Sequence, residues 1–247
     1  MPFDLWFKTS GTWINIATVL VGTGLGVFLG RQLPKRMQLV ITQGLGLFTL
    51  FIGVTMAGSL TGVQAGKVDG AIVGLVAMVL GGLLGEWAGI EEKLEALGNW
   101  LKRHFKGQGK FTEGFVVASL LFCVGPMTLI GSLNNGLTGD DTLLVLKSAM
   151  DGLAAIALTS SYGIGVGFSS LIILLYQGGV SLMAGGLARS LPDPANNPIV
   201  LLITGVGGLM VLGTGINLLE LTRIRTASFL PALLITPLLY WLLNWHR

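Results

Sequence analysis

Long apolar stretches recur along the entire chain, and short polar segments separate them. A helix needs about 20 predominantly apolar residues to cross the hydrocarbon core of a bilayer. On this measure the sequence predicts eight membrane-spanning helices, at residues 11–30, 38–60, 69–89, 113–133, 142–160, 163–188, 198–221 and 226–245. We therefore expect an all-α polytopic membrane protein in which residues 1–247 form a single transmembrane domain.

The composition of the chain agrees with a location inside a bilayer. Of its 247 residues, 52% are hydrophobic and 11% are charged, and the mean hydropathy is +0.77. A soluble domain usually devotes roughly a quarter of its residues to charged side chains. The 38 glycines also suit a membrane protein, because small residues let helix backbones approach closely in lipid.

The basic residues predict which side of the membrane each loop occupies, because cytoplasmic loops are enriched in Lys and Arg. With the N-terminus outside, ten of the 15 basic residues fall in cytoplasmic loops, namely Arg31, Lys35, Arg36, Lys93, Lys102, Arg103, Lys106, Lys110, Arg223 and Arg225. This bias holds only if the chain crosses the membrane an even number of times between Lys110 and Arg223. Segments 113–133 and 142–160 must therefore either both cross the membrane or both fail to cross it. We expect both to cross, which leaves both chain termini outside.

The longest polar part of the chain, residues 90–111, has the pattern of an amphipathic helix. Its apolar residues Ile90, Leu94, Leu97 and Leu101 recur on one helical face, and charged residues occupy the rest. Such a helix is expected to lie on the inner membrane surface as a connector. A regulatory or partner-binding helix is the alternative.

Two parts of the chain resemble each other. Ile41-Thr42 with Gly46-Leu-Phe-Thr-Leu-Phe-Ile-Gly-Val54 lines up with Ile203-Thr204 and Gly208-Leu-Met-Val-Leu-Gly-Thr-Gly-Ile216, and Arg31-Gln-Leu-Pro34 lines up with Arg189-Ser-Leu-Pro192. The sequence thus predicts a first repeat (11–89) and a second repeat (163–245) around a central pair of helices (113–160). Equivalent helices are five spans apart, so the repeats would be inverted, as in many secondary transporters. Chance similarity between Gly-rich apolar helices is the alternative.

The fourth predicted span contains residues that weaken a helix in mid-membrane. Pro126 lacks an N–H and its ring clashes with the preceding turn, and Gly125 and Gly131 are poor helix formers. Backbone groups freed by a break are tolerated at that depth only inside the protein or beside water. The neutral polar residues near the break are candidates for binding a solute: Thr128, Ser132, Asn134 and Asn135. A kinked helix that simply packs is the alternative.

The fifth predicted span carries two ionisable residues, Lys147 and Asp151, one helical turn apart. Ionisable side chains are costly in lipid, so they mark functional sites, and an i,i+4 pair can neutralise itself. We expect Asp151 to bind a cation or relay a proton; the alternative is a buried pair that only fixes helix register. Further candidates for the same site are Asn15, Gln177 and Asn217, which lie inside other predicted spans.

No motif for enzymatic chemistry is recognisable. The chain has one cysteine, Cys123, and its two histidines, His104 and His246, lie among basic residues near helix ends. Neither a P-loop nor an H-E-x-x-H helix occurs, and glycines such as Gly22 and Gly24 lie inside an apolar span with no preceding strand. We therefore expect no enzyme activity, no cofactor, no metal and no nucleic-acid partner.

Several short motifs are spread over nearly the whole chain: Thr12-Trp-Ile-Asn15, Phe122-Cys-Val-Gly-Pro-Met127, Gly131-Ser132 with Gly139-Asp140, Lys147-Ser-Ala-Met-Asp151, Tyr176-Gln-Gly178 and Leu230-Pro-Ala232. Together these motifs resemble the YqgA/YdfK-like family of bacterial membrane proteins. The resemblance implies a bacterial cell-membrane protein. It implies little about activity, because that family is itself one of unknown function.

The residues favour a secondary transporter or exporter of a small charged solute. Its site is expected near the membrane midplane, between the broken fourth span and Asp151. Two alternatives stay open: an ion channel-like pore lined by the same residues, and a membrane scaffold or assembly subunit in which polar residues only join helices. The expected partners are the lipid bilayer, a small solute or ion, and a second copy of the chain in a homo-oligomer.

Overall fold

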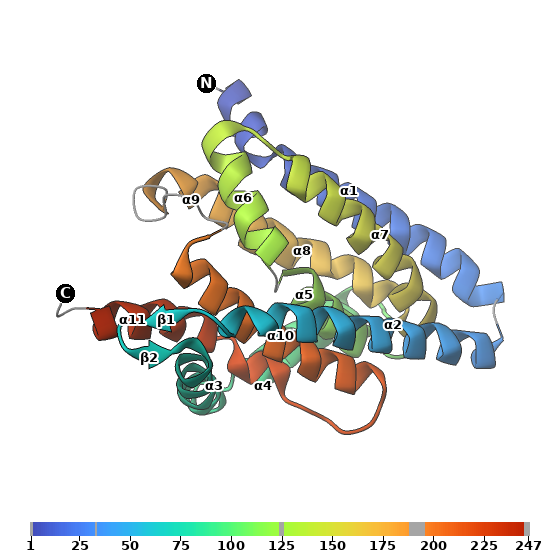
Figure 1. The fold of residues 1–247 in the computed structure, drawn as a ribbon. Coiled ribbons are helices and arrows are strands. Elements are labelled where there is room, and N and C mark those ends of the chain that lie inside the picture. The colour runs from blue at the N-terminus through green and yellow to red at the C-terminus, as the bar shows by residue number, and fades with distance from the viewer. Residues whose placement is uncertain (1, 33, 124–125, 188–195, 245–247) are drawn as a thin grey trace. The chain divides into compact units, whose positions relative to one another are not determined.

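Helices make up most of the computed structural model, which describes residues 2–32, 34–123, 126–187 and 196–244 (Figure 1). The helices with α geometry are α1 (Pro2–Gln32), α2 (Lys35–Ala57), α3 (Gly70–Trp87), α4 (Ile90–His104), α5 (Phe111–Cys123), α6 (Pro126–Thr138), α7 (Thr142–Tyr162), α8 (Ser169–Ile173), α9 (Gly179–Leu187), α10 (Pro198–Leu218) and α11 (Ala232–Asn244). Within the described part of the chain, seven helical segments are long and apolar enough to cross a membrane, and a bent pair of helices brings the number to eight. The prediction of an all-α polytopic membrane protein is confirmed.

The broken fourth span is two helices in the structure. α5 ends at Cys123, α6 begins at Pro126, and the two helices are bent by 61°. Proline is well placed at the start of a helix, where its missing N–H removes no intrahelical bond. The break predicted at Pro126 is therefore present, whereas Gly125 lies outside the described residues. Gly131 was wrongly predicted to weaken the span, because it lies inside an uninterrupted α6, where it makes room for the Leu144 side chain.

The segment predicted as a simple span at 163–188 is irregular. It consists of the 3₁₀ turn η2 (Ile164–Phe168), α8, the π-helix η3 (Leu174–Gly178) and α9. Wider π turns are rare and occur frequently at functional sites. This irregular segment, Ile164–Ala184, is still long and apolar enough to cross a membrane.

Smaller differences from the prediction arise at the ends of elements. The predicted amphipathic helix forms as α4 but ends at His104, because Lys106 and Gly109 adopt positive φ angles of 50° and 61°. A two-stranded hairpin, β1 (Gln64–Ala65) paired antiparallel with β2 (Val68–Asp69), was not predicted. Strands of two residues are too short to display an alternating hydrophobic pattern. The short 3₁₀ turns η1 (Gly58–Leu60) and η4 (Thr226–Phe229) flank α2 and α11.

The chain divides into two compact units. The first unit comprises residues 1–45, 95–123 and 127–192, and the second comprises residues 46–94, 124–126 and 193–247. Each unit therefore contains helices from both predicted repeats: α1 lies with α8 and α9 in the first, and α3 lies with α10 and α11 in the second.

In the first unit, α1 packs along α7 through a stripe of glycines. Gly22, Gly26 and Gly30 recur every fourth residue of α1 and touch the backbone of α7 at Gly152, Ile156 and Ser160. The residue numbers of the contacting pairs rise together along both helices, so α1 and α7 run parallel. Without side chains in the way, the backbones come into direct contact, which is how small residues join membrane helices.

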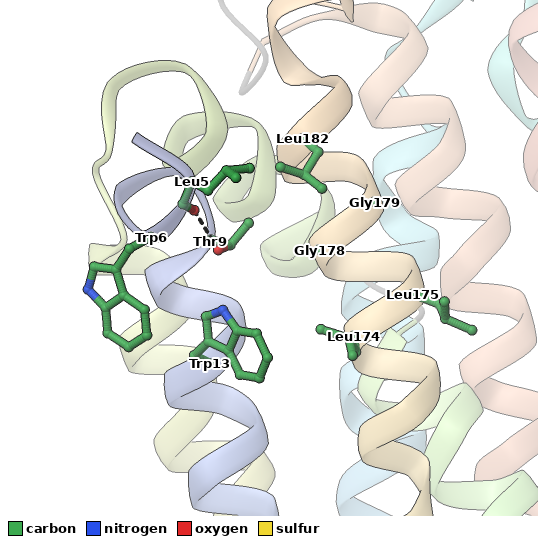
Figure 2. Close-up of a pocket in the computed structure, with 9 residues that line it drawn as sticks. All are labelled: Leu5, Trp6, Thr9, Trp13, Leu174, Leu175, Gly178, Gly179 and Leu182. Carbon is green, nitrogen blue, oxygen red and sulfur yellow. Dashed lines mark hydrogen bonds between the residues drawn. The ribbon is translucent and has the colours of Figure 1, made fainter. Parts of the chain in front are cut away.

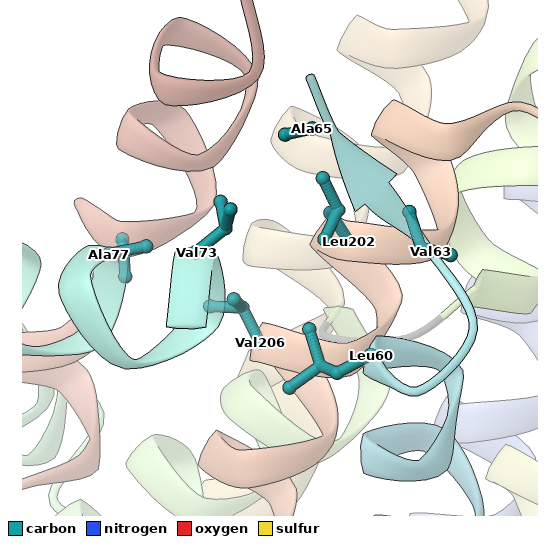
Figure 3. Close-up of a cluster of buried hydrophobic side chains, with 8 residues drawn as sticks. Leu60, Val63, Ala65, Val73, Ala77, Leu202 and Val206 are labelled. Atoms are coloured by element: carbon teal, nitrogen blue, oxygen red, sulfur yellow. The ribbon is translucent and has the colours of Figure 1, made fainter. Parts of the chain in front are cut away.

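In the second unit, α3, α10 and α11 surround an apolar core. Its members come from η1, the hairpin and these three helices (Figure 3), and they are Leu60, Val63, Ala65, Val73, Ala77, Leu202, Val206 and Ala232. Close packing again depends on glycine. Gly81 faces the backbone of Ala232, and Gly85 faces the carbonyl oxygen of Ser228.

A cluster of charged residues ties the end of α3 and the start of α4 to the segment before α11. Arg225 forms ion pairs with Glu86, at 3.0 Å between Nη1 and Oε1, and with Glu92. Glu91 is buried and accepts a hydrogen bond of 2.9 Å from the backbone N–H of Ala227.

Replacing Gly26 by alanine is expected to destabilise the first unit. A Cβ atom there would lie 2.6 Å from the carbonyl oxygen of Ile156 and 2.7 Å from Cβ of Thr159, so the helices must separate. Overpacking of this kind costs about 1–3 kcal/mol. Thermal unfolding in detergent should show a lower midpoint for Gly26→Ala. The matched control is Gly24→Ala on the same helix, where a Cβ would meet no atom within 4 Å; equal effects of both substitutions would contradict the packing assigned to Gly26.

Replacing Arg225 by glutamine is expected to alter the response of stability to acid. A backbone hydrogen bond and the Arg225 guanidinium hold the pKa of Glu92 below its ordinary value of 4.5. The pKa is lowered in the folded protein, so the stabilisation is present at neutral pH and is lost as the pH falls through that pKa. Unfolding midpoints between pH 7 and pH 4 should fall less steeply in Arg225→Gln than in wild type. The exposed Lys93→Gln is the control and should leave the slope unchanged.

Candidate functional site

An ion pair lies near the centre of α7. Lys147 and Asp151 are 6% and 7% exposed, and the Lys147 ammonium contacts Oδ2 of the Asp151 carboxylate. The helix itself brings them together, because residues four apart lie on the same face. Taking either charge out of water is costly, and losing one partner of a buried pair costs about 3–5 kcal/mol.

Two neutral side chains from other helices extend this pair into a network. Asn15 of α1 donates through Nδ2 to Asp151 Oδ2 and to Gln177 Oε1, each at 3.0 Å. Gln177 in turn donates through Nε2 to the hydroxyl of Thr12 at 3.4 Å. Asn15, Thr12 and Gln177 are each fully buried. The first unit therefore connects α1, α7 and the segment 164–187 through polar side chains near mid-span.

The π-helix η3 places Gln177 in this network. A π turn runs over Leu174–Gly178 and ends on the first of the two glycines that follow Gln177. Its last residue, Gly178, lies against the Thr12 side chain, where a Cβ would be 3.6 Å from Cγ2. A contact of that length is an ordinary van der Waals distance, so Gly178 lies directly beside α1 at the level of Thr12.

One oxygen atom in the network has no hydrogen-bond donor among the described residues. Asn15 Oδ1 is buried and unpaired. This atom is assigned as the oxygen of the amide because the other end faces two acceptors, Asp151 Oδ2 and Gln177 Oε1, and must therefore be the NH₂ group. Buried hydroxyl oxygens without a partner also occur in the first unit, at Thr23, Ser119, Ser132, Thr159 and Ser181.

Other predicted site residues have structural contacts instead. Asn135 of α6 donates to the carbonyl of Phe7 at 2.9 Å and accepts from the N–H of Gly11 at 3.2 Å, so its amide bridges one turn of α1. Thr128 donates to the carbonyl of Phe122 at 3.3 Å, across the break between α5 and α6. Asn134 is half-buried on α6. None of these three bonds to Asp151 or Lys147.

Asn217 lies in the second unit. Its Nδ2 donates to the carbonyl of Ile224 and its Oδ1 accepts from the N–H of the same residue, both at 2.7 Å. Both polar ends of the amide are satisfied by the loop that follows α10. Asn217 therefore stabilises a loop, and the prediction that it joins the site is not supported by its contacts.

The sequence analysis did not include Thr12 among the site residues. Thr12 lies three residues before Asn15, so the two side chains share one face of a helix. That spacing was a usable signal, but a single threonine in an apolar span carries no ionisable group. Within the described ranges, no group of three or more His, Cys, Asp or Glu residues is placed to hold a metal ion.

An apolar groove lies beside the network. It has a volume of about 680 Å³, and Figure 2 shows its walls on α1 and on the segment from η3 to α9. The lining residues are Leu5, Trp6, Thr9, Trp13, Leu174, Leu175, Gly178, Gly179 and Leu182. The lining is almost entirely apolar, in contrast to the polar network around Asp151 and Asn15.

Comparison with known proteins places the chain among bacterial membrane proteins. It is 26% identical over 234 residues to the uncharacterized membrane protein YdfK of Bacillus subtilis, which covers 95% of this chain and 96% of that protein. It is 30% identical over 232 residues to the uncharacterized protein YqgA of Escherichia coli, which covers 91% and 93%. No solved structure matches the chain significantly.

The family model described as "Protein of unknown function (DUF554)" matches residues 10–241. The resemblance to the YqgA/YdfK-like proteins is thereby confirmed over nearly the whole length. The protein belongs to the DUF554 family of membrane proteins.

Proposed function

We propose that the protein is a secondary transporter of a small charged solute, with its site at Asp151, Lys147, Asn15 and Gln177. The buried polar network of the first unit carries the proposal. An ion pair and two amides near the centre of apolar helices are costly to insert, and such groups in membrane helices characteristically belong to ion or solute pathways.

The unpaired oxygen atoms favour a transport role over a scaffold. Polar residues that only join helices should satisfy one another, because an unsatisfied group in lipid costs several kcal/mol. In the first unit, Asn15 Oδ1 and five buried hydroxyls have no partner among the described residues. Among the second unit's described residues the one such atom is Arg225 Nε, on a side chain that forms ion pairs at helix ends. Such a difference is expected if the first unit encloses water or a solute.

The packing of equivalent helices supports the proposed inverted repeat. Each helix of the first predicted repeat lies against its counterpart from the second: α1 against the segment 164–187, α2 against α10, and α3 against α11 or η4. In each pair of helices, residue numbers rise along one helix as they fall along the other, so the two helices are antiparallel. The contacts are Thr12–Gln177 and Thr23–Gly167 for the first pair, Gly46–Leu219 and Gly53–Leu212 for the second, and Gly81–Ala232 and Gly85–Ser228 for the third. Antiparallel counterparts are what an inverted repeat requires, and transporters of this type bind substrate between the repeats.

The parallel packing of α1 and α7 supports eight crossings. If α1, α2 and α3 each cross the membrane, α7 runs parallel to α1 only when the bent pair α5–α6 crosses once more. An even number of crossings places both termini on one side. With the cytoplasmic enrichment of Lys and Arg, that side is the outside of the bacterial inner membrane.

Substitution of Asp151 by asparagine is expected to abolish solute flux. The change keeps the size of the side chain but removes the charge that the solute or coupling ion needs. Flux would be measured in proteoliposomes across a panel of cations, anions and amino acids. A saturable, slow flux supports a transporter, whereas fast non-saturating currents would support the channel. No flux of any solute through folded, inserted wild-type protein would contradict transport and favour the scaffold.

The control for this experiment is Asn217→Ala. That substitution removes two loop hydrogen bonds in the second unit and is expected to cost about 1–3 kcal/mol of stability. Flux per folded molecule should nevertheless stay near the wild-type level. If Asp151→Asn and Asn217→Ala reduce flux only in proportion to folded protein, the role assigned to Asp151 is wrong.

A further inference from the structure

We propose that the site binds a small monovalent cation and that the Lys147 ammonium is a tethered substitute for it. The cation would lie between the Asp151 carboxylate and Asn15 Oδ1, in the place from which Lys147 withdraws. This inference rests on the proposed function and specifies the charge of the ligand.

The side-chain atom of the network that has no partner at all among the described residues is an acceptor. Asn15 uses both N–H groups, on Asp151 and on Gln177, while its carbonyl oxygen has no donor. A side-chain amide oxygen can only accept a hydrogen bond or coordinate a cation. Carboxylate and amide oxygens are also the ligand types that hard cations prefer. The residues that surround the open position therefore fit a positively charged ligand.

An anion fits the same position poorly. It would have to approach Lys147 while lying beside the Asp151 carboxylate and the unpaired oxygen of Asn15. At the low dielectric of a membrane interior, repulsion between like charges is strong. Both amide N–H groups of Asn15 are already used within the network, and Gln177 donates one of its own to Thr12.

Lys147 is well placed to leave the carboxylate. Its partner among the described residues is Asp151, and it lies one turn closer to the start of α7 at Thr142. A lysine has a flexible four-carbon stem, and such side chains extend along apolar surface to keep the ammonium in water. Lys147 can therefore move toward the membrane surface when another cation takes its place on Asp151.

The experiment measures cation binding through the thermal unfolding of detergent-purified protein, followed by the fluorescence of its six tryptophans. Sodium, potassium, ammonium and methylammonium chloride would each be titrated against N-methyl-D-glucamine chloride at constant ionic strength. At least one small cation should raise the unfolding midpoint in a saturable manner. In Lys147→Met the same shift should be half-complete at a cation concentration at least roughly tenfold lower than in wild type. The reason is that the Lys147 ammonium, a tethered competitor at high effective concentration, has been removed.

Two further variants test the proposed ligands. Asp151→Asn should abolish the cation-specific shift. Asn15→Ala should weaken it more than Gln177→Ala, because both remove the Asn15–Gln177 hydrogen bond but only the first also removes the open oxygen and the hydrogen bond to Asp151.

The response of Lys147→Met distinguishes the possible outcomes. If an anion, titrated separately as its N-methyl-D-glucamine salt, stabilises the wild type and Lys147→Met abolishes that effect, the site binds anions and the inference is overturned. If neither wild type nor folded Lys147→Met shows a cation-specific shift, the pair is structural and the inference is also overturned. Either result is compatible with solute flux in proteoliposomes. The flux measurement therefore tests the proposed transport function independently of this inference.

Discussion

The buried ion pair between Lys147 and Asp151 is the interaction around which the first unit is arranged. Two opposite charges at the centre of an apolar helix are tolerable only if each remains paired and further hydrogen bonds support them. α7 supplies the pair by itself, but the second hydrogen bond to the carboxylate comes from Asn15 on α1. The pair therefore constrains which helix lies beside α7 and at what height.

Glycine allows that constraint to be met. α1 approaches α7 closely enough for Asn15 to reach Asp151 because Gly22, Gly26 and Gly30 present no side chain to the α7 backbone. On another side, the π turn and Gly178 bring Gln177 against Thr12 and Asn15. The polar site and the apolar packing are thus parts of one arrangement, and a methyl group in the glycine stripe would disturb both.

The two units differ in where they place charged and polar groups relative to their apolar helices. The second unit has an apolar core, and its ion pairs of Arg225 with Glu86 and Glu92 lie at helix ends, where water screens them. The first unit keeps charge and unpaired oxygen atoms near mid-span. This division suits a protein in which one unit holds a solute and the other stabilises the helices. The exposed apolar side chains of both units are consistent with the membrane location of the family.

The sequence by itself determined the membrane class, the positions of the long helices, the break before Pro126 and the pairing of Lys147 with Asp151. These features depend on local properties: the length of an apolar run, the missing N–H of proline and the i,i+4 spacing of a helix. Tertiary structure alone decided which neutral polar residues join the pair. Asn15, Asn135 and Asn217 look alike in the sequence, yet the first reaches Asp151, the second bridges a turn of α1, and the third holds a loop. Asn217 bonds to a residue seven positions away, whereas Asn15 and Asn135 bond to residues 136 and 128 positions away. Contacts between helices depend on which faces meet, and residues that far apart in the chain carry no local signal of the contact.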